Sequence, residues 1–449
     1  MGKAAKWGAW LLGACVVAVA AWFAINATDE ALSEEARAAL LVPPLPAPTR
    51  DNGYLDFVVL GAPEEVPTYE AALERMRALQ DGTFAPPWGE FRSDPRIPRC
   101  PCLEAAAEPG LREVIDGQRT LLRRYREMRD KPRFVNVMEA KSFESALPNY
   151  QEMSTAARLV LLDAALRFHA GDRAGALREL EREAAFYRRM SSEPAVGLID
   201  KMIAFAAQDR IALFVAELAR RTPPGDASWR RLEALVHPLT PEELDVVPTL
   251  RRSIAEDLRW MQARRYPRAM LEGYAQWGEP APWWLPLAPY LYRPHQSANR
   301  CAARSRIFLE LARHPSAEFA AALEAARARA EALDPGRLAR VVFNPVMWAL
   351  PGWAHCDVSG YVARMHGRAG VQTLVRLQVK LRAGGIVKSD QVAAALAGPL
   401  GQAHADPFTG KPMRFDAQTG TLGFEAKLEH LSGAVREQRE RYGRMALPL

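Results

Sequence analysis

Residues 156–190 read AARLVLLDAALRFHAGDRAGALRELEREAAFYRRM. Apolar side chains recur in this stretch at three- and four-residue spacing on both sides of Ala170-Gly171-Asp172, which is the pattern of two amphipathic helices joined by a turn. Helical spacing of the same kind dominates from about residue 103 onward. The sequence therefore predicts a mainly α-helical protein, arranged as an irregular helical stack.

An apolar run close to the N-terminus predicts where the protein is located. Residues 7–25 form 19 consecutive positions without a charge, and a helix of that length rises about 28 Å, close to the thickness of a bilayer's hydrocarbon core. Two lysines precede the run and four acidic residues follow it within ten positions. Since basic residues stay on the cytoplasmic side, we expect a single-pass anchor in a bacterial inner membrane, with the N-terminus cytoplasmic and the bulk of the chain periplasmic.

Two other interpretations of this run stay open. A signal peptide would be cleaved after Ala27, although the apolar region of signal peptides usually spans about 7–15 residues. Leu12-Gly13-Ala14-Cys15 resembles a lipoprotein box with Cys15 as the acylated residue, but ten more apolar residues follow it. The length of the run favours an uncleaved anchor.

The chain is expected to divide into five regions, which are a cytoplasmic stub (1–6), a transmembrane anchor (7–27), a juxtamembrane helix with a proline-rich linker (28–50), an α-helical ectodomain (51–400), and a C-terminal hairpin and helix (401–449). The juxtamembrane helix is expected over residues 28–41, before four prolines that enforce an extended chain. Residues 54–60 predict one short strand. The turn Ala417-Gln418-Thr419-Gly420 predicts a β-hairpin.

The helix pair of residues 156–190 resembles a tetratricopeptide repeat. The resemblance lies in the alanine-rich first helix, the Gly171-Asp172 turn, and Ala174 with Ala176-Leu177 at the start of the second helix. It implies a stack of helix pairs whose concave face binds peptides or proteins. The resemblance covers about 35 residues, and no second copy aligns at the same period. An ordinary antiparallel helix pair is the alternative.

Composition and motifs narrow the possible chemistry. Of the 449 residues, 49% are hydrophobic and 25% charged, so the ectodomain can bury a core. The net charge of +6 is spread along the chain, which argues against a nucleic-acid partner. The sequence lacks a His-Glu-x-x-His zinc motif, a Gly-x-Ser-x-Gly nucleophile turn and a phosphate-binding loop. No catalytic, cofactor-binding or metal-binding residue is therefore predicted.

Four cysteines lie outside the anchor, namely Cys100, Cys102, Cys301 and Cys356. In an exported domain an even number of cysteines predicts two disulfides with three possible connectivities. We expect Cys301 and Cys356 both to be oxidised, with each other or with the other pair. A redox role or a metal site for Cys100-Pro101-Cys102, and free thiols, are the alternatives.

The stretch from residue 274 to 294 is unusual because five prolines separate its large rings, which include Trp277, Trp283, Trp284, Tyr290 and Tyr292. A long helix cannot persist through it. The rings are expected either to fill the core between helices or to be exposed, at the membrane interface or as anchors for a partner. The exposed interpretation makes them candidate interaction residues.

We therefore expect a membrane-anchored binding, scaffold or accessory protein of the bacterial envelope, with a protein partner. One alternative is an envelope hydrolase acting on lipid or cell wall, and another is an immunity protein that binds an envelope-directed toxin. An apolar pocket that encloses carboxyl groups of perturbed pKa would favour an enzyme. A groove without such groups would favour binding.

Overall fold

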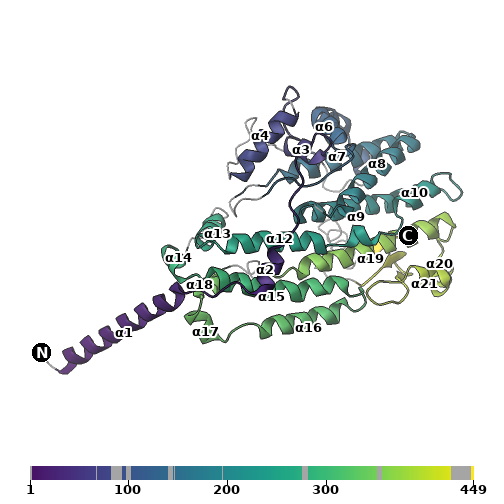
Figure 1. Ribbon diagram of the computed structural model, residues 1–449. Coiled ribbons are helices and arrows are strands. Elements are labelled where there is room, and N and C mark those ends of the chain that lie inside the picture. The colour runs from purple at the N-terminus through teal and green to yellow at the C-terminus, as the bar shows by residue number, and fades with distance from the viewer. Residues whose placement is uncertain are drawn as a thin grey trace.

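The computed structural model of this 449-residue chain is mainly α-helical, with a small antiparallel sheet near the C-terminus, which confirms the predicted fold class. Figure 1 shows the helices stacked in tiers, with α1 projecting from one end. The structure describes residues 3–66, 68–81, 94–97, 103–139, 145, 147–194, 196–275, 282–350, 356–425 and 446–449.

The elements up to the middle of the chain are α1 (Lys3–Ala27), α2 (Glu34–Leu40), α3 (Gly53–Val58), α4 (Thr68–Gln80), η1 (Ala105–Ala107), α5 (Leu111–Gly117), α6 (Arg119–Arg129), α7 (Tyr150–His169), α8 (Arg173–Ser192), α9 (Leu198–Arg221) and α10 (Trp229–Leu235). Those that follow are α11 (Pro241–Leu244), α12 (Val247–Met261), α13 (Tyr266–Ala275), η2 (Leu285–Leu287), α14 (Ala288–Leu291), α15 (Pro294–Glu310), η3 (Leu311–Arg313), α16 (Phe319–Ala332), α17 (Arg337–Val342), α18 (Pro345–Ala349), α19 (Ser359–Ala383), α20 (Ser389–Ala397), α21 (Pro399–Ala403), β1 (Arg414–Asp416), β2 (Thr421–Gly423) and β3 (Ala446–Pro448).

Within α1, residues Trp7–Ala27 are long and apolar enough to cross a membrane. Most of this helix is exposed, but its last turns contact the rest of the protein. Trp22 and Phe23 pack against a core of the helical stack, and Asn26 is fully buried. The end of α1 is therefore part of the folded helical stack.

The chain between α1 and α2 is not helical, so the continuous helix expected over residues 28–41 is wrong. Helix α1 ends at Ala27 and α2 begins at Glu34. The Asp29 carboxylate instead accepts hydrogen bonds from the backbone N–H groups of His295 (2.7 Å) and Gln296 (3.2 Å), in the first turn of α15. A carboxylate is stabilised at a helix N-terminus, and this contact holds the connecting segment on α15.

Two apolar cores hold the stack together. The helices from α3 to α10 enclose the first core, with the second half of α19, α20 and the sheet. Helices α2, α12 to α16 and α18 enclose the second core, with the first half of α19. In Figure 1 the second core lies on the side from which α1 projects.

The long helices α9 and α19 pack against each other and take part in both cores. On α9, Phe205 belongs to the second core and Ile211 to the first. Between these positions Asp209 forms a 2.9 Å ion pair with Arg368 of α19, and both side chains are only 3% exposed. This buried pair therefore lies where the two cores meet.

The strand predicted at residues 54–60 is also wrong, because this segment contains α3. The Asn52 side chain begins the helix by accepting a hydrogen bond from the Tyr54 N–H (3.1 Å). Tyr54 and Phe57 are three residues apart, and both rings pack against Phe134. Their apolar surfaces are buried on one face of a helix, which a strand would place on opposite faces.

Helices α7 and α8 form the predicted pair, and Asp172 begins α8 by accepting a hydrogen bond from the Gly175 N–H (2.8 Å). The relation of this pair to tetratricopeptide repeats stays a prediction. The predicted C-terminal hairpin is β1 and β2, paired antiparallel. The sequence did not predict β3, which pairs with the other side of β2. The final helix, expected over residues 425–445, lies outside the described residues except for Glu425.

Candidate functional site: a pocket beneath α2

The aromatic residues predicted as an interaction site have different environments. Trp283 is 86% exposed and Tyr290 64% exposed, whereas Trp284 packs against the second core. Tyr292 is fully buried, and its hydroxyl donates a hydrogen bond to the Met261 carbonyl (2.9 Å). Trp277 lies outside the described residues. These rings therefore do not form one common surface.

The proline-rich segment that carries these rings contains short helices. Pro286, Pro289 and Pro294 stand in the first positions of η2, α14 and α15. Proline is favoured there because its φ angle suits a helix and the first N–H groups of a helix have no partner within it. The prolines thus start successive helices that turn the chain from α13 into α15.

Cys301 and Cys356 form a disulfide, with Cα atoms 5.3 Å apart. This is one of the connectivities that the sequence left open. The bond joins α15 to the residues just before α19, and both cysteines are buried in the second core. Cys100 and Cys102 lie outside the described residues.

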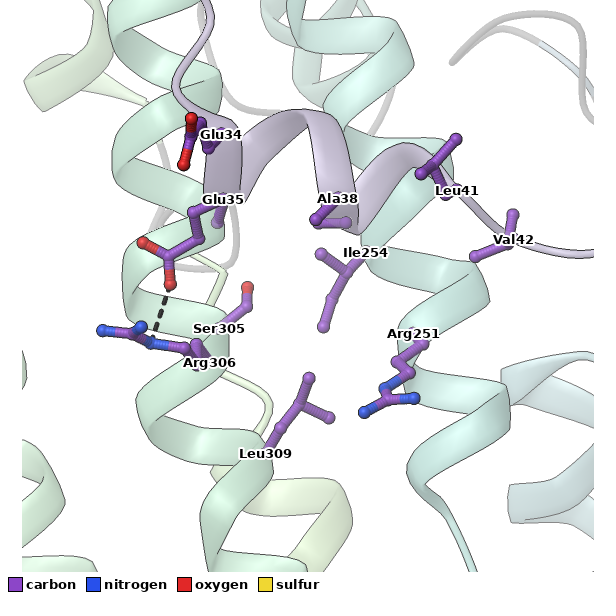
Figure 2. A pocket seen from close by; sticks show the side chains of 12 residues that line it. Glu34, Glu35, Ala38, Leu41, Val42, Arg251, Ile254, Ser305, Arg306 and Leu309 are labelled. Carbon is purple, nitrogen blue, oxygen red and sulfur yellow. Dashed lines mark ion pairs between the residues drawn. The ribbon is translucent and has the colours of Figure 1, made fainter.

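Sequence reasoning missed a pocket that lies beneath α2, between α12 and α15 (Figure 2). We call it the juxtamembrane pocket, because α2 is the first helix after α1, which is long and apolar enough to cross a membrane. It is an open cavity of about 560 Å³, lined by Glu34, Glu35, Ala38, Ala39, Leu41, Val42, Arg251, Ile254, Ala302, Ser305, Arg306 and Leu309.

Short side chains explain how α2 covers this space. Ala36 is fully buried where α2 packs on α12 and α15, and an alanine allows the helices to approach closely. Ala38 and Ala39 on the same helix line the pocket, and their small side chains leave its volume unfilled. The pocket thus exists because the side chains of α2 are too small to fill the groove between the two helices that α2 crosses.

The walls of the juxtamembrane pocket are apolar, and its charges are unevenly paired. Figure 2 shows Ile254 of α12 and Leu309 of α15 facing the cavity. Glu35 and Arg306 form an ion pair of 2.7 Å on one side. Arg251, on the opposite wall, is exposed and forms no ion pair with any described residue. Glu34 also lines the pocket, is exposed and forms no ion pair with any described residue. The pocket therefore offers apolar surface with a free positive charge on the α12 wall and a free negative charge on α2.

The acidic groups with strongly raised pKa values lie elsewhere. Burial raises the pKa of Glu256 and of Asp257 on α12 to about 7. Burial also raises the pKa of Asp200 to about 6, although this carboxylate accepts hydrogen bonds from the Tyr150 hydroxyl (2.8 Å) and the Gly197 N–H (3.1 Å). None of these three groups lines the juxtamembrane pocket. A pocket without carboxyl groups of perturbed pKa favours binding over catalysis, so the juxtamembrane pocket has the features of a binding site.

A second cavity, of about 440 Å³, lies between α5, α6 and α7 and is mostly charged. At its centre Asp163 accepts hydrogen bonds from Arg112 (3.1 Å), Arg126 (3.0 Å) and Arg167 (3.1 Å). These arginines already share a carboxylate within the protein. The cavity therefore presents to a ligand a charged network whose central carboxylate is already paired.

Among the described residues, no group of three His, Cys, Asp or Glu side chains is placed to hold a metal ion. No protein-family model matches the chain, and neither a curated protein nor a solved structure shows a match to it. The function is therefore inferred from the residues of the site itself.

The sequence contains little signal for the juxtamembrane pocket. Its walls come from three segments, at residues 34–42, 251–254 and 302–309, that are separated by up to about 260 positions along the chain. The run of alanines in α2 is the one local feature that indicates a close helix contact. Which helices it contacts depends on the tertiary fold.

Proposed function

We propose that the protein is a membrane-anchored binding or scaffold protein of the bacterial envelope, whose juxtamembrane pocket receives an apolar segment of a protein partner. The observation that carries this proposal is the composition of the pocket. Ile254 and Leu309 offer apolar surface in an open cavity, while the carboxyl groups with raised pKa values lie outside it. Such a pocket can bind an apolar group, but it offers no evident acid–base pair for catalysis.

Arg251 suggests a second property of the partner. A guanidinium group without an ionic partner beside apolar walls favours a ligand that carries a carboxylate next to an apolar side chain. A chain terminus, or an Asp or Glu next to a Leu or Phe, would satisfy both features. We therefore expect the partner segment to be apolar and to carry one negative charge near the mouth of the pocket.

The position of the pocket supports a role at the membrane surface. Its roof, α2, is separated from α1 by only six residues, so a bound partner would be held close to the bilayer. The charge distribution around the apolar run favours a periplasmic ectodomain. An alkaline phosphatase reporter fused to the C-terminus tests this orientation, because it is active only outside the cytoplasm. Activity of a cytoplasmic reporter at the same position would contradict the proposal.

A pocket-filling variant tests the binding site. Ala38 is exposed on α2 at the edge of the cavity, so Ala38→Trp should fill the cavity while leaving the buried contact of Ala36 intact. Ala47→Trp is the matched control, because Ala47 is exposed in the linker and does not line the cavity. Tagged full-length chains would be purified from detergent-solubilised envelopes. We expect the wild type and Ala47→Trp to retain the same partner and Ala38→Trp to lose it. Equal recovery with both variants would exclude the pocket as the binding site.

An envelope hydrolase is the second candidate, and the raised pKa values of Glu256 and Asp257 favour it. Glu256→Gln and Asp257→Asn would then abolish an activity of purified protein on lipid or peptidoglycan without affecting partner recovery. The identity of the partner tests the third candidate. A toxic envelope enzyme recovered through the pocket would indicate an immunity protein.

A further inference from the structure

We propose that the ectodomain rests on the outer surface of the bilayer through a second contact beside α1. We call this contact the bilayer-facing surface, and it consists of Trp283, Leu287, Tyr290, Leu338, Val341 and Phe343. The inference rests on the proposed function, in which α1 is the retained anchor. The ligand is the lipid interface itself.

Hydrogen bonds between α1 and the segment 341–342 fix the height of this surface relative to the bilayer. The indole Nε1 of Trp22 donates to the Val341 carbonyl (2.9 Å), and Asn26 Nδ2 donates to the Val342 carbonyl (2.9 Å). The apolar run of α1 ends at Ile25, so Trp22 lies only about 4.5 Å inside that end. The run must occupy most of a hydrocarbon core of about 30 Å. Val341 therefore lies at the outer boundary of the hydrocarbon.

The side chains around Val341 suit this position. Leu338 is 78% exposed, Val341 62% and Phe343 44%, and none of the residues of α17 is buried. In water, these three large apolar side chains on one short segment would stay exposed to solvent, and this exposure is unfavourable in free energy. At the membrane boundary they would be transferred to an apolar environment, which is favourable.

The second part of the surface comes from η2 and α14, and α14 contacts α1 directly. Here Trp283 and Tyr290 are largely exposed, and Leu287 is 38% exposed. Trp and Tyr are the residues that membrane proteins concentrate at the lipid–water boundary. Figure 1 shows α14, α17 and α18 gathered at the end of the molecule from which α1 projects.

The clustering distinguishes this surface from ordinary exposed apolar residues. Outside α1, eleven large apolar side chains of the described residues are strongly exposed, and six of them belong to the bilayer-facing surface. The other five are spread over separate elements, and they are Leu41, Leu147, Ile199, Leu333 and Val387. Single exposed apolar residues are common, whereas a cluster around a membrane helix indicates a lipid contact.

Arg264 is a basic residue at the outer end of α1, where the lipid headgroups would lie. Arg264 donates hydrogen bonds to the carbonyl of Ala27 (3.1 Å), at the end of α1, and to that of Pro289 (3.4 Å), in α14. It is thus held between the anchor and the aromatic part of the surface. Guanidinium groups at this height interact favourably with lipid phosphates.

Site-specific photocrosslinking tests the inference on the full-length chain. Benzoylphenylalanine would replace Leu338 or Tyr290 in protein reconstituted into vesicles of phosphatidylethanolamine and phosphatidylglycerol. Val387 is the matched control, because it is 49% exposed and lies just before α20. Figure 1 shows α20 at the opposite end of the molecule from α1. We expect lipid adducts at positions 338 and 290 to exceed those at 387 several-fold, measured by mass spectrometry.

Two further measurements separate this inference from the proposed function. Carbonate extraction shows whether the chain is anchored at all, and release of the protein would contradict the retained anchor. If the protein stays in the membrane but positions 338 and 290 give no more lipid adduct than position 387, the bilayer-facing surface is wrong and the anchor stands. A protein adduct that replaces the lipid adduct in native membranes would also overturn it, because the surface would then bind a protein.

Discussion

Asn26 Oδ1 accepts a 2.7 Å hydrogen bond from the backbone N–H of Asn344. The two residues are 318 positions apart, and both are buried. Asn344 has a left-handed backbone (φ 54°) at the start of α18, and its side chain donates to the Ser297 hydroxyl (2.8 Å) of α15. The last turn of α1 thus completes a hydrogen-bond network that joins α18 to α15. Cleavage after Ala27 would break the chain between this turn and α2.

Asn26→Ala should destabilise the protein by about 2–4 kcal/mol, because it leaves the buried Asn344 N–H and the partly buried Val342 carbonyl without their partner. Thermal unfolding in detergent micelles measures the effect. Thr28→Ala is the control, since the Thr28 hydroxyl bonds only to the nearby Ile25 carbonyl at an exposed site. Equal melting temperatures for wild type and Asn26→Ala would show that the end of α1 is not coupled to the ectodomain.

Arg368→Met should cost about 3–5 kcal/mol, because it leaves the Asp209 carboxylate buried without its main counter-charge. The double variant Arg368→Met, Asp209→Leu should recover much of this loss, since it removes both charges. Denaturant unfolding of the two variants gives the comparison. A double variant less stable than the single one would mean that Asp209 has other essential partners.

Replacing both Cys301 and Cys356 by Ala should lower the free energy of unfolding by about 2–4 kcal/mol. The disulfide closes a loop of 55 residues, and an open loop gains conformational entropy in the unfolded chain. Non-reducing peptide mapping should find the Cys301–Cys356 peptide pair in protein purified from envelopes. Two free thiols at these positions would contradict the structure.

Asp257→Asn should stabilise the protein above neutral pH. Burial raises the pKa of Asp257 from 3.8 to about 7, so the folded state holds a proton between pH 4 and pH 7 that the unfolded state releases. Stability therefore falls as the pH rises through this window. The Asn variant lacks this penalty, and because the side chain is partly exposed we expect a gain of about 1–3 kcal/mol at pH 8. At pH 4 the variant should match the wild type, and an equal gain at both pH values would argue against titration of Asp257.

Trp283→Ala and Trp284→Ala should behave differently although they are adjacent. Trp283 is 86% exposed, so its removal should leave the melting temperature unchanged. Trp284 packs against the second core, and its removal should destabilise the protein by about 2 kcal/mol. Melting curves of both single variants decide the assignment. Loss of stability in Trp283→Ala alone would place that ring, and not Trp284, in the core.

Local sequence determined the parts of this protein that depend on neighbouring residues. The apolar run of residues 7–25 is one continuous helix, and the breaks at Gly171-Asp172 and Thr419-Gly420 mark a helix pair and a hairpin in the structure. In each case the signal is a spacing of apolar residues or the turn preference of a residue type, which act over a few positions. The mainly helical fold could therefore be predicted.

Only the tertiary structure decided where helices stop and which distant residues meet. The chain from 28 to 33 leaves the helix because Asp29 bonds to the first turn of α15, and residues 53–58 are helical because their rings pack on Phe134. The juxtamembrane pocket likewise depends on three segments remote in sequence. Such contacts are set by the packing of whole helices, and the free energy of that packing outweighs the local preferences of short segments.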